Sequence, residues 1–201
     1  MSPRRADPAL SERRRGALVR AGYAEILDKG VQAVTIDSVV ARAGSSKGGA
    51  LYYFPTKEDL LFAVLDWLFS QLNSTLDEVV RAQDSPRARL ASELEVLFHG
   101  AEVNRKVYRV LFDFLGMGVH NDRFRGLFAA FFDRCRERDK AIVAEGIKQR
   151  QFRPVKPEDA AGVVRALVDG YCLQWLMGEE KAALETYRDR CRAVLGSYLL
   201  R

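Results

Sequence analysis

The sequence predicts an all-α protein, with an N-terminal three-helix domain of the helix-turn-helix kind and a larger C-terminal helical bundle. Apolar residues recur at helical spacing along nearly all of the 201 residues, and no segment of useful length alternates as a strand would. Two short helical segments joined by a glycine follow a longer one, which is the layout of a helix-turn-helix unit. Residues 1–57 hold ten Lys/Arg and five Asp/Glu, whereas residues 58–201 hold 22 of each. These observations predict a basic domain over 1–57 and a neutral one over 58–201.

Capping residues delimit the N-terminal helices. Leu18, Val19 and Ile26 share the apolar face of the first predicted helix. Two short segments follow it, 36–43 and 47–53. Their predicted N-caps are Thr35 and Ser46. The stop signals after the three segments are Gly30, Gly44 and Pro55.

The rest of the chain divides into longer helices. Thr56 and Asp59 resemble a capping box and open a helix that carries apolar residues to Val79. Ser85 and Pro86 start the next one. The triplet Gly116-Met117-Gly118 is expected to interrupt a helix. The predicted spans of the bundle are about 57–79, 86–103, 104–115, 121–149 and 157–177, with a last helix from about Lys181.

Two consecutive glycines, Gly48 and Gly49, open the segment 47–53. Glycine costs about 1 kcal/mol relative to alanine inside a helix, so the pair suggests that something must approach the backbone closely. A recognition helix placed in the major groove of DNA has that requirement, and its N-terminus favours phosphate. Hydroxyls of serine and tyrosine can donate to phosphate oxygens, and lysines supply charge. Composition alone favours a plainer alternative, a short connecting helix with a flexible start.

Several other classes of function find no support in the sequence. No apolar run is long enough to span a membrane and no signal segment follows Met1, so a cytoplasmic protein is expected. The three cysteines are far apart and read as reduced thiols. His99 and His120 lack a nearby acidic or thiol cluster, and no catalytic arrangement assembles locally, so neither a metal site, a cofactor nor an enzyme is expected.

Residues 18–61 resemble the DNA-binding domain of the tetracycline-repressor (TetR) family of bacterial transcription regulators. The matching run is GxxxxTIxxVxxxAGxSKG from Gly30 to Gly48, followed by YFPTKEDLL from Tyr53 to Leu61. A weaker similarity to a C-terminal pattern of the family begins at Phe152-Arg153-Pro154. The sequence departs from the family at two points. Leu51 stands where most members have tyrosine, and Val34 occupies one position of the usual threonine pair.

The resemblance, together with the residue chemistry, implies a set of DNA contacts in the N-terminal domain. The expected contacts are Thr35, Ser45, Ser46, Lys47, Gly48, Gly49, Tyr52, Tyr53 and Lys57. Lys47 and Gly49 are assigned to the base-facing side. Tyr53 has two competing roles, a phosphate contact or packing beneath the helix. The run Arg13-Arg14-Arg15 reaches the DNA backbone or minor groove in one interpretation and is a solvated arm in the other.

In this family the helical body binds a small effector and forms a dimer. The resemblance therefore assigns a ligand role to aromatic residues that otherwise read as plain core: Phe98, Tyr108, Phe112, Phe128 and Phe131. Asn104, Arg105 and His99 are candidates to orient a polar group. Apolar faces on the last two helices imply either burial within the protomer or a four-helix dimer interface. Its candidates are Leu167, Tyr171, Trp175, Tyr187, Val194 and Tyr198.

The resemblance implies a homodimeric transcription regulator, most often a repressor, that binds a palindromic double-stranded DNA operator. A small, largely apolar or aromatic effector is expected to release it. One alternative is a helical ligand-binding or enzyme-like bundle in which DNA binding is secondary. Another is a sequence-independent DNA-compacting protein, against which the neutral body argues, because such proteins spread basic charge widely.

Overall fold

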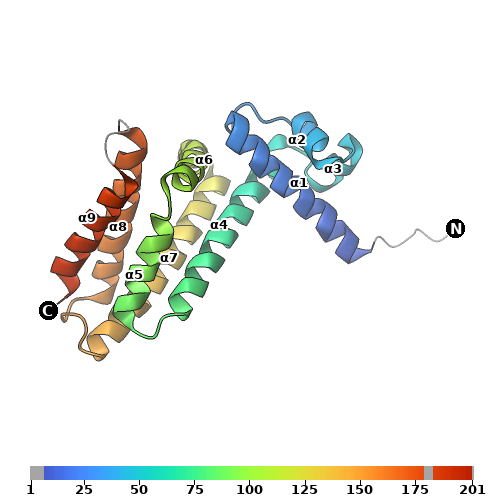
Figure 1. The fold of residues 1–201 in the computed structure, drawn as a ribbon. Coiled ribbons are helices and arrows are strands. Elements are labelled where there is room, and N and C mark those ends of the chain that lie inside the picture. The colour runs from blue at the N-terminus through green and yellow to red at the C-terminus, as the bar shows by residue number, and fades with distance from the viewer. Residues whose placement is uncertain (1–6, 179–182, 201) are drawn as a thin grey trace. The chain divides into compact units, whose positions relative to one another are not determined.

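The computed structural model describes residues 7–178 and 183–200. Over these residues the chain folds into helices joined by turns, with one isolated antiparallel bridge between Phe152 and Leu200. The helices are α1 (Pro8–Lys29), α2 (Ile36–Ala43), α3 (Lys47–Tyr53), α4 (Lys57–Arg81), α5 (Pro86–Leu97), α6 (Ala101–His120), α7 (Asp122–Lys148), α8 (Pro157–Met177) and α9 (Leu184–Leu199) (Figure 1). The all-α prediction is confirmed, and the predicted start of the last helix at Lys181 lies outside the described residues.

The chain forms two compact units that meet between Phe69 and Ser70. The N-terminal unit contains α1, α2, α3 and the first half of α4. The C-terminal unit contains the second half of α4 and α5 to α9. The helix α4 is therefore common to both units, and the predicted domain boundary at 57/58 lies at its first residue.

The N-terminal unit packs α1 and the two short helices α2 and α3 around an apolar core. Its buried side chains include Leu18, Ile26, Val34, Val39, Phe54, Leu60 and Val64. A Cβ atom added to Gly22 would lie 3.0 Å from Cγ2 of Val64, so this glycine lets α1 approach α4 closely. Tyr23 on α1 and Trp67 on α4 meet edge to face, with ring centroids 5.3 Å apart.

Local capping bonds explain why the N-terminal helices begin and end where they do. The Thr35 hydroxyl oxygen accepts from the Ser38 amide at 3.1 Å, and the Ser38 hydroxyl oxygen accepts from the Thr35 amide at 3.2 Å, which completes a capping box. Gly44 ends α2 in the left-handed conformation, with φ 60°. At the start of α4 the Asp59 carboxylate accepts from the Thr56 amide at 3.2 Å. The predicted bounds of α2 and α3 are confirmed.

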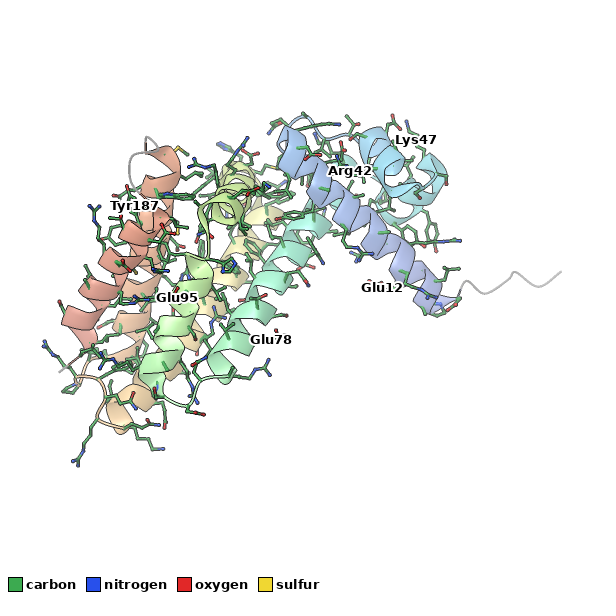
Figure 2. The ribbon with its side chains drawn as sticks, in the orientation of Figure 1. Glu12, Arg42, Lys47, Glu78, Glu95 and Tyr187 are labelled. Atoms are coloured by element: carbon green, nitrogen blue, oxygen red, sulfur yellow. The ribbon has the colours of Figure 1, made fainter. Side chains whose placement is uncertain are left out.

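The C-terminal unit is a helical bundle in which α6 crosses the other helices. Figure 1 shows α6 nearly end on, whereas α5, α7, α8 and α9 run along the page. Its core includes Leu94, Phe98, Val143, Phe152, Val168, Cys172 and Leu195. Glu95 on α5 accepts from Arg188 on α9 at 2.8 Å, and Figure 2 labels Glu95 on its helix. None of the helices described is long and apolar enough to cross a bilayer.

Two predicted helix boundaries in this unit were wrong. The helix predicted over 86–103 ends at Leu97, where the buried Phe98 is the C-cap, and α6 starts after Gly100. The predicted interruption at Gly116-Met117-Gly118 does not occur, because α6 continues to His120. A Cβ atom at Gly118 would lie 3.3 Å from the Phe128 ring, so this glycine serves the close packing of α6 on α7.

The turn between α7 and α8 contacts the end of α7 and the end of α9. A Cβ atom at Gly146 would lie 2.1 Å from the ring of Phe152, so only glycine admits the buried Phe152 at this point. The Arg153 amide donates to the Leu199 carbonyl at 2.7 Å, which ties the turn to the end of α9. Arg150, with φ 57°, provides the left-handed step that ends α7.

Candidate DNA-binding surface and ligand cavity

The short helix α3 turns one face to solvent and the other to the core of the N-terminal unit. Ala50 on α3 and Phe54, its C-cap, are buried. The exposed face consists of Lys47, Gly48, Leu51 and Tyr52. Tyr52 is 76% exposed, a high value for an aromatic side chain in a folded domain. Figure 2 labels Lys47 at the start of α3. An exposed helix that offers a cation, a bare backbone and an aromatic hydroxyl can approach a nucleic acid groove.

The two glycines of α3 have different physical reasons. A Cβ atom at Gly49 would lie 3.0 Å from Oγ of Ser46, so this glycine makes room for the N-cap. The Ser46 oxygen accepts from the Gly49 amide at 3.1 Å. A Cβ atom at Gly48 would meet nothing within 4 Å. No contact inside the N-terminal unit therefore requires glycine at position 48, and the space beside it is open to an outside molecule.

The predicted hydroxyl donors occupy capping positions. Thr35 and Ser46 use a hydroxyl oxygen to cap α2 and α3. A hydroxyl has one proton to donate as well as lone pairs to accept, so both caps keep a donor for a phosphate oxygen. Ser45 is exposed beside them. Val34 is fully buried, so the departure from the threonine pair places a core residue there.

The two lysines assigned to DNA already have partners within the unit. Lys47 pairs with Asp37 of α2 at 2.9 Å, and both side chains are largely exposed. Lys57 donates to the Gln32 carbonyl at 2.8 Å, which braces the start of α4 against the turn after α1. An exposed ion pair contributes about 0–1 kcal/mol, so a phosphate or a base can compete for Lys47 at small cost.

Tyr53 and the arginine run are tied to the body of the unit. The Tyr53 hydroxyl accepts from Oγ of Ser11 at 3.1 Å, which links α3 to α1. Arg13, Arg14 and Arg15 lie within α1, so they are part of a helix and not of a free arm. The Arg15 guanidinium stacks over the Phe54 ring at 5.4 Å.

A buried carboxylate, Glu25, joins α1 to α2. It accepts from Lys29 at 2.8 Å and from Arg42 at 2.6 Å. These hydrogen bonds, that from Lys29 first, lower the pKa of Glu25 to about 2. Arg42 also pairs with Asp28. Arg42 lies in the last turn of α2, so this network sets the position of α2 on α1 (Figure 2).

The aromatic residues assigned to an effector separate into two groups. Phe98 and Tyr108 lie in the core of the C-terminal unit, and Phe112 packs against that core with its ring 6.2 Å from that of Tyr108. Phe128 and Phe131 are buried on α7, where each ring lies within 6.2 Å of Phe132. Of the five, Phe112 lines the cavity described next.

A cavity of about 340 Å³ lies between α6 and α8. Its lining residues are Arg105, Arg109, Phe112, Asp113, Leu176 and Met177. Volumes of about 300–1,000 Å³ are usual for small-molecule sites, so this cavity suits a small ligand. Arg105 stacks over the Trp175 ring, with its guanidinium carbon 5.0 Å from the centroid. Asn104, also expected to orient a ligand, is buried and donates to the Leu97 carbonyl.

A cluster of charged side chains is buried in the same unit. Arg138 donates to Oε1 of Glu93 at 3.0 Å and to Asp77 at 3.1 Å. Asp139 is fully buried, and its carboxyl group is hydrogen-bonded to the carboxylate of Glu93, which requires a proton on one of the two. Burial, and then the nearby Glu93, raise the pKa of Asp139 well above its usual value. Arg165 pairs with Asp169 but keeps Nε and Nη1 without partners.

The candidate dimer face shows a mixture of exposed and buried residues. Trp175 is 5% exposed and packs within the unit, so it has little surface left for a partner. Val194 on α9 is exposed. Leu173 on α8 is exposed as well, and the sequence interpretation did not single it out. Burial raises the pKa of the Cys172 thiol to about 12, which fits the core role expected for it.

Besides Leu173, three features of the sites escaped the sequence interpretation. Arg109, one turn after Arg105, was not selected, although an i, i+4 pair of arginines was visible in the sequence. Met177 follows the apolar stripe of α8 and gave no separate signal. The buried Asp139 lies in a charged stretch that reads as solvated. No group of three metal-binding side chains occurs within 7–178 and 183–200.

Comparisons with known proteins agree with these observations. Residues 18–64 match the N-terminal domain of the bacterial regulatory proteins of the tetR family. Residues 86–200, more than half of the chain, match the C-terminal domain of the BetI-type transcriptional repressors. The HTH-type transcriptional regulator BetI of Burkholderia ambifaria is 27% identical over 196 residues, which cover 94% of this chain and 97% of the relative.

Solved structures show the same fold. A protein described as a transcriptional regulator from Saccharomonospora viridis, solved in complex with choline, aligns with a TM-score of 0.86 at 20% identity. A TetR transcription regulator from Haloarcula marismortui aligns with a TM-score of 0.86 at 24% identity. Each alignment covers 94% of this chain and 99% of the other. This family consists of transcription regulators and not of enzymes. The chain therefore belongs to the TetR family of ligand-responsive, DNA-binding transcription regulators, with a C-terminal domain of the BetI type.

Proposed function

We propose that the chain is a repressor that binds a palindromic operator as a homodimer and is released by a small effector. Each protomer places the exposed face of α3 in the major groove. Among the features of the N-terminal unit, Gly48 carries this proposal: its helix position costs stability, and the open space beside it has no use inside the unit. The two-fold axis of a dimer then matches the symmetry of a palindrome, with recognition helices about 34–36 Å apart or somewhat more.

The base-reading and phosphate roles divide among the residues of this surface. Lys47 and the backbone at Gly48 and Gly49 face the bases. Thr35, Ser45, Ser46, Tyr52 and Lys57 contact phosphates. Tyr53 acts mainly through its bond to Ser11, which holds α3 on α1. Lys47→Ala is expected to blur operator preference, whereas Lys57→Ala weakens all DNA sequences about equally and flattens the dependence on salt.

Two observations support a dimer formed through α8 and α9. Both helices carry exposed apolar side chains, Leu173 and Val194. The ring centroids of Tyr171 on α8 and Tyr187 on α9 lie 6.0 Å apart, so this contact holds the two helices together beneath the exposed side chains. Leu173→Glu with Val194→Glu is expected to yield monomers in sedimentation and to abolish binding to a palindrome. A stable monomer of the unmodified chain at micromolar concentration would contradict the dimer.

The effector is proposed to enter the C-terminal unit near Phe112, which lines the cavity between α6 and α8. The regulator from S. viridis holds choline, so binding of a small organic molecule has precedent on this fold. Since α4 runs through both units, a ligand-induced shift of this helix changes the spacing of the recognition helices. We expect operator and effector to oppose each other by about 1–3 kcal/mol, with equal effect in both directions.

The decisive experiment uses the DNA that flanks the gene. A mobility-shift titration at several salt concentrations is expected to show tight binding to a fragment with an inverted repeat and weak binding to a scrambled repeat. Small hydrophobic compounds that raise the unfolding temperature are then added to the complex. Equal affinity for the intact and the scrambled repeat would refute operator recognition. Compounds that bind yet leave operator affinity unchanged would refute the coupling.

A further inference from the structure

The cavity between α6 and α8 has an excess of positive charge. Two of its lining side chains are cationic, Arg105 and Arg109, and Asp113 offsets one of these charges. The other lining residues, Phe112, Leu176 and Met177, are apolar. A ligand that complements this lining has an apolar body and one negative charge.

The two arginines are arranged to hold an anion. They are four residues apart on α6, so their side chains leave the helix on the same face. Stacking on Trp175 fixes the plane of the Arg105 guanidinium and leaves the N–H groups on its edge free to donate. Asp113, one turn after Arg109, is the one carboxylate among the lining residues, so the two guanidinium groups outnumber it. A guanidinium fork matches the two oxygens of a carboxylate.

We propose that this cavity binds a small amphipathic acid. Its carboxylate lies between Arg105 and Arg109, and its apolar body packs on Phe112, Leu176 and Met177. The inference deepens the proposed effector site and depends on the proposed function for its effect on DNA. An organic cation such as the choline of the S. viridis protein meets two guanidinium groups here and is disfavoured.

Three probes with the same alkyl chain test the charge of the ligand: octanoate, 1-octanol and octyltrimethylammonium. Their binding to the full chain, without DNA, is measured by isothermal titration calorimetry and by the fluorescence of Trp175 in a Trp67→Phe background. Octanoate is expected to bind at least tenfold more tightly than octanol and to change Trp175 emission, because it displaces or orders Arg105. Octyltrimethylammonium is expected to bind more weakly than octanol.

Substitutions locate the site and its charge. Arg105→Gln and Arg109→Gln are each expected to weaken octanoate binding about tenfold and octanol binding less than twofold, in line with the loss of one charge-assisted contact. Lys106→Gln is the matched control, because it removes a cation from the same turn of α6 outside the cavity lining, and it changes octanoate affinity less than twofold. Arg109→Glu, at an exposed position, is expected to reverse the preference in favour of octyltrimethylammonium.

Three outcomes overturn the inference. They are tighter binding of octyltrimethylammonium than of octanoate to the unmodified chain, octanoate affinity that is indifferent to both arginine substitutions, and no detectable binding of octanoate. Operator affinity, measured separately with and without octanoate, tests the proposed function. A chain that binds octanoate through the arginines but ignores the operator retains the acid site and loses the regulatory role.

Discussion

Each of the two units buries a carboxylate, and the pKa values of the two carboxylates are shifted in opposite directions. Glu25 in the N-terminal unit is held by Lys29 and Arg42, and its pKa is lowered to about 2. Asp139 in the C-terminal unit is buried beside another carboxylate, Glu93, and its pKa is raised. Arg165 in the same unit keeps two N–H positions without partners.

The two units also differ in where their polar groups are available for further contacts. In the N-terminal unit the buried Glu25 has two cationic partners, and the open positions lie at the surface, at Gly48 and the capping hydroxyls. The C-terminal unit buries two carboxylates together, Glu93 and Asp139, and leaves Nε and Nη1 of Arg165 without partners. A buried polar group without a partner costs about 1–3 kcal/mol.

The unfolding free energy of each unit can be measured separately, because the sequence has two tryptophans and each unit contains one. Trp67 lies in the N-terminal unit and Trp175 in the C-terminal unit. In a Trp67→Phe background, denaturant unfolding followed by fluorescence reports the C-terminal unit. In a Trp175→Phe background it reports the N-terminal unit. This separation matters because two units need not unfold in one step.

The largest effect is expected from Arg138→Met. The substitution removes the cation that pairs with the fully buried Glu93 and leaves that carboxylate in the core without the ion pair. We expect the C-terminal unit to lose about 3–5 kcal/mol of unfolding free energy, measured through Trp175. Arg134→Met on the same helix is the control, because Arg134 is largely exposed and its pair with Asp77 contributes about 0–1 kcal/mol. Equal losses in the two variants would show that burial does not set the cost.

Glu25→Gln is expected to have a moderate effect on the N-terminal unit. It removes a charge-assisted acceptor from Lys29 and Arg42, and we expect a loss of about 1–3 kcal/mol at neutral pH, measured through Trp67. The pKa of Glu25 is lowered from 4.5 to about 2, so this stabilisation is present above pH 4.5 and disappears as the pH falls to 2. The difference between the variant and the unmodified chain must shrink across that range. A difference that persists at pH 2 contradicts the role of the charge.

Asp139→Asn is expected to act in the opposite direction. The folded chain holds the Asp139 proton more tightly than the unfolded chain, whose carboxyl has a pKa near 3.8. Stability of the C-terminal unit therefore falls as the pH rises above 3.8 through the raised pKa of the folded state. The uncharged variant lacks this dependence, and we expect it to be more stable at pH 8 by about 1 kcal/mol. Urea titrations at pH 5 and pH 8 measure the effect, and a variant less stable than the unmodified chain at both values rules it out.

The smallest change in stability is expected from Gly48→Ala. The added methyl group meets open space and raises helix propensity, so the N-terminal unit gains about 0.5–1 kcal/mol or less. The same methyl group faces the bound DNA, and we expect operator affinity to fall at least tenfold in mobility shifts. Gly49→Ala is the contrast, because its methyl group meets Oγ of Ser46 and lowers stability. A Gly48→Ala variant that keeps full operator affinity would show that DNA recognition does not require glycine at this position.

Capping residues, which act over one helical turn, predicted some of the helix boundaries. The bounds of α2 and α3 follow from Thr35, Gly44 and Ser46, whose hydrogen bonds reach no farther than the next turn. The bounds of α5 and α6 could not be read this way. Glycine at 118 weakens a helix by itself, yet the helix persists because Phe128 of α7 packs against that glycine.

The sequence by itself determined the helical fold class, the helix-turn-helix layout and the placement of positive charge in the first 57 residues. These features depend on periodicity, capping and composition, which are short-range properties. Only the tertiary structure decided which glycine of α3 serves a cap and which faces open space. It also brought Arg105 and Arg109 together with Met177 around one cavity, and it buried Asp139 beside Glu93. Those outcomes depend on how helices distant in the chain pack against one another, and no short-range pattern encodes that packing.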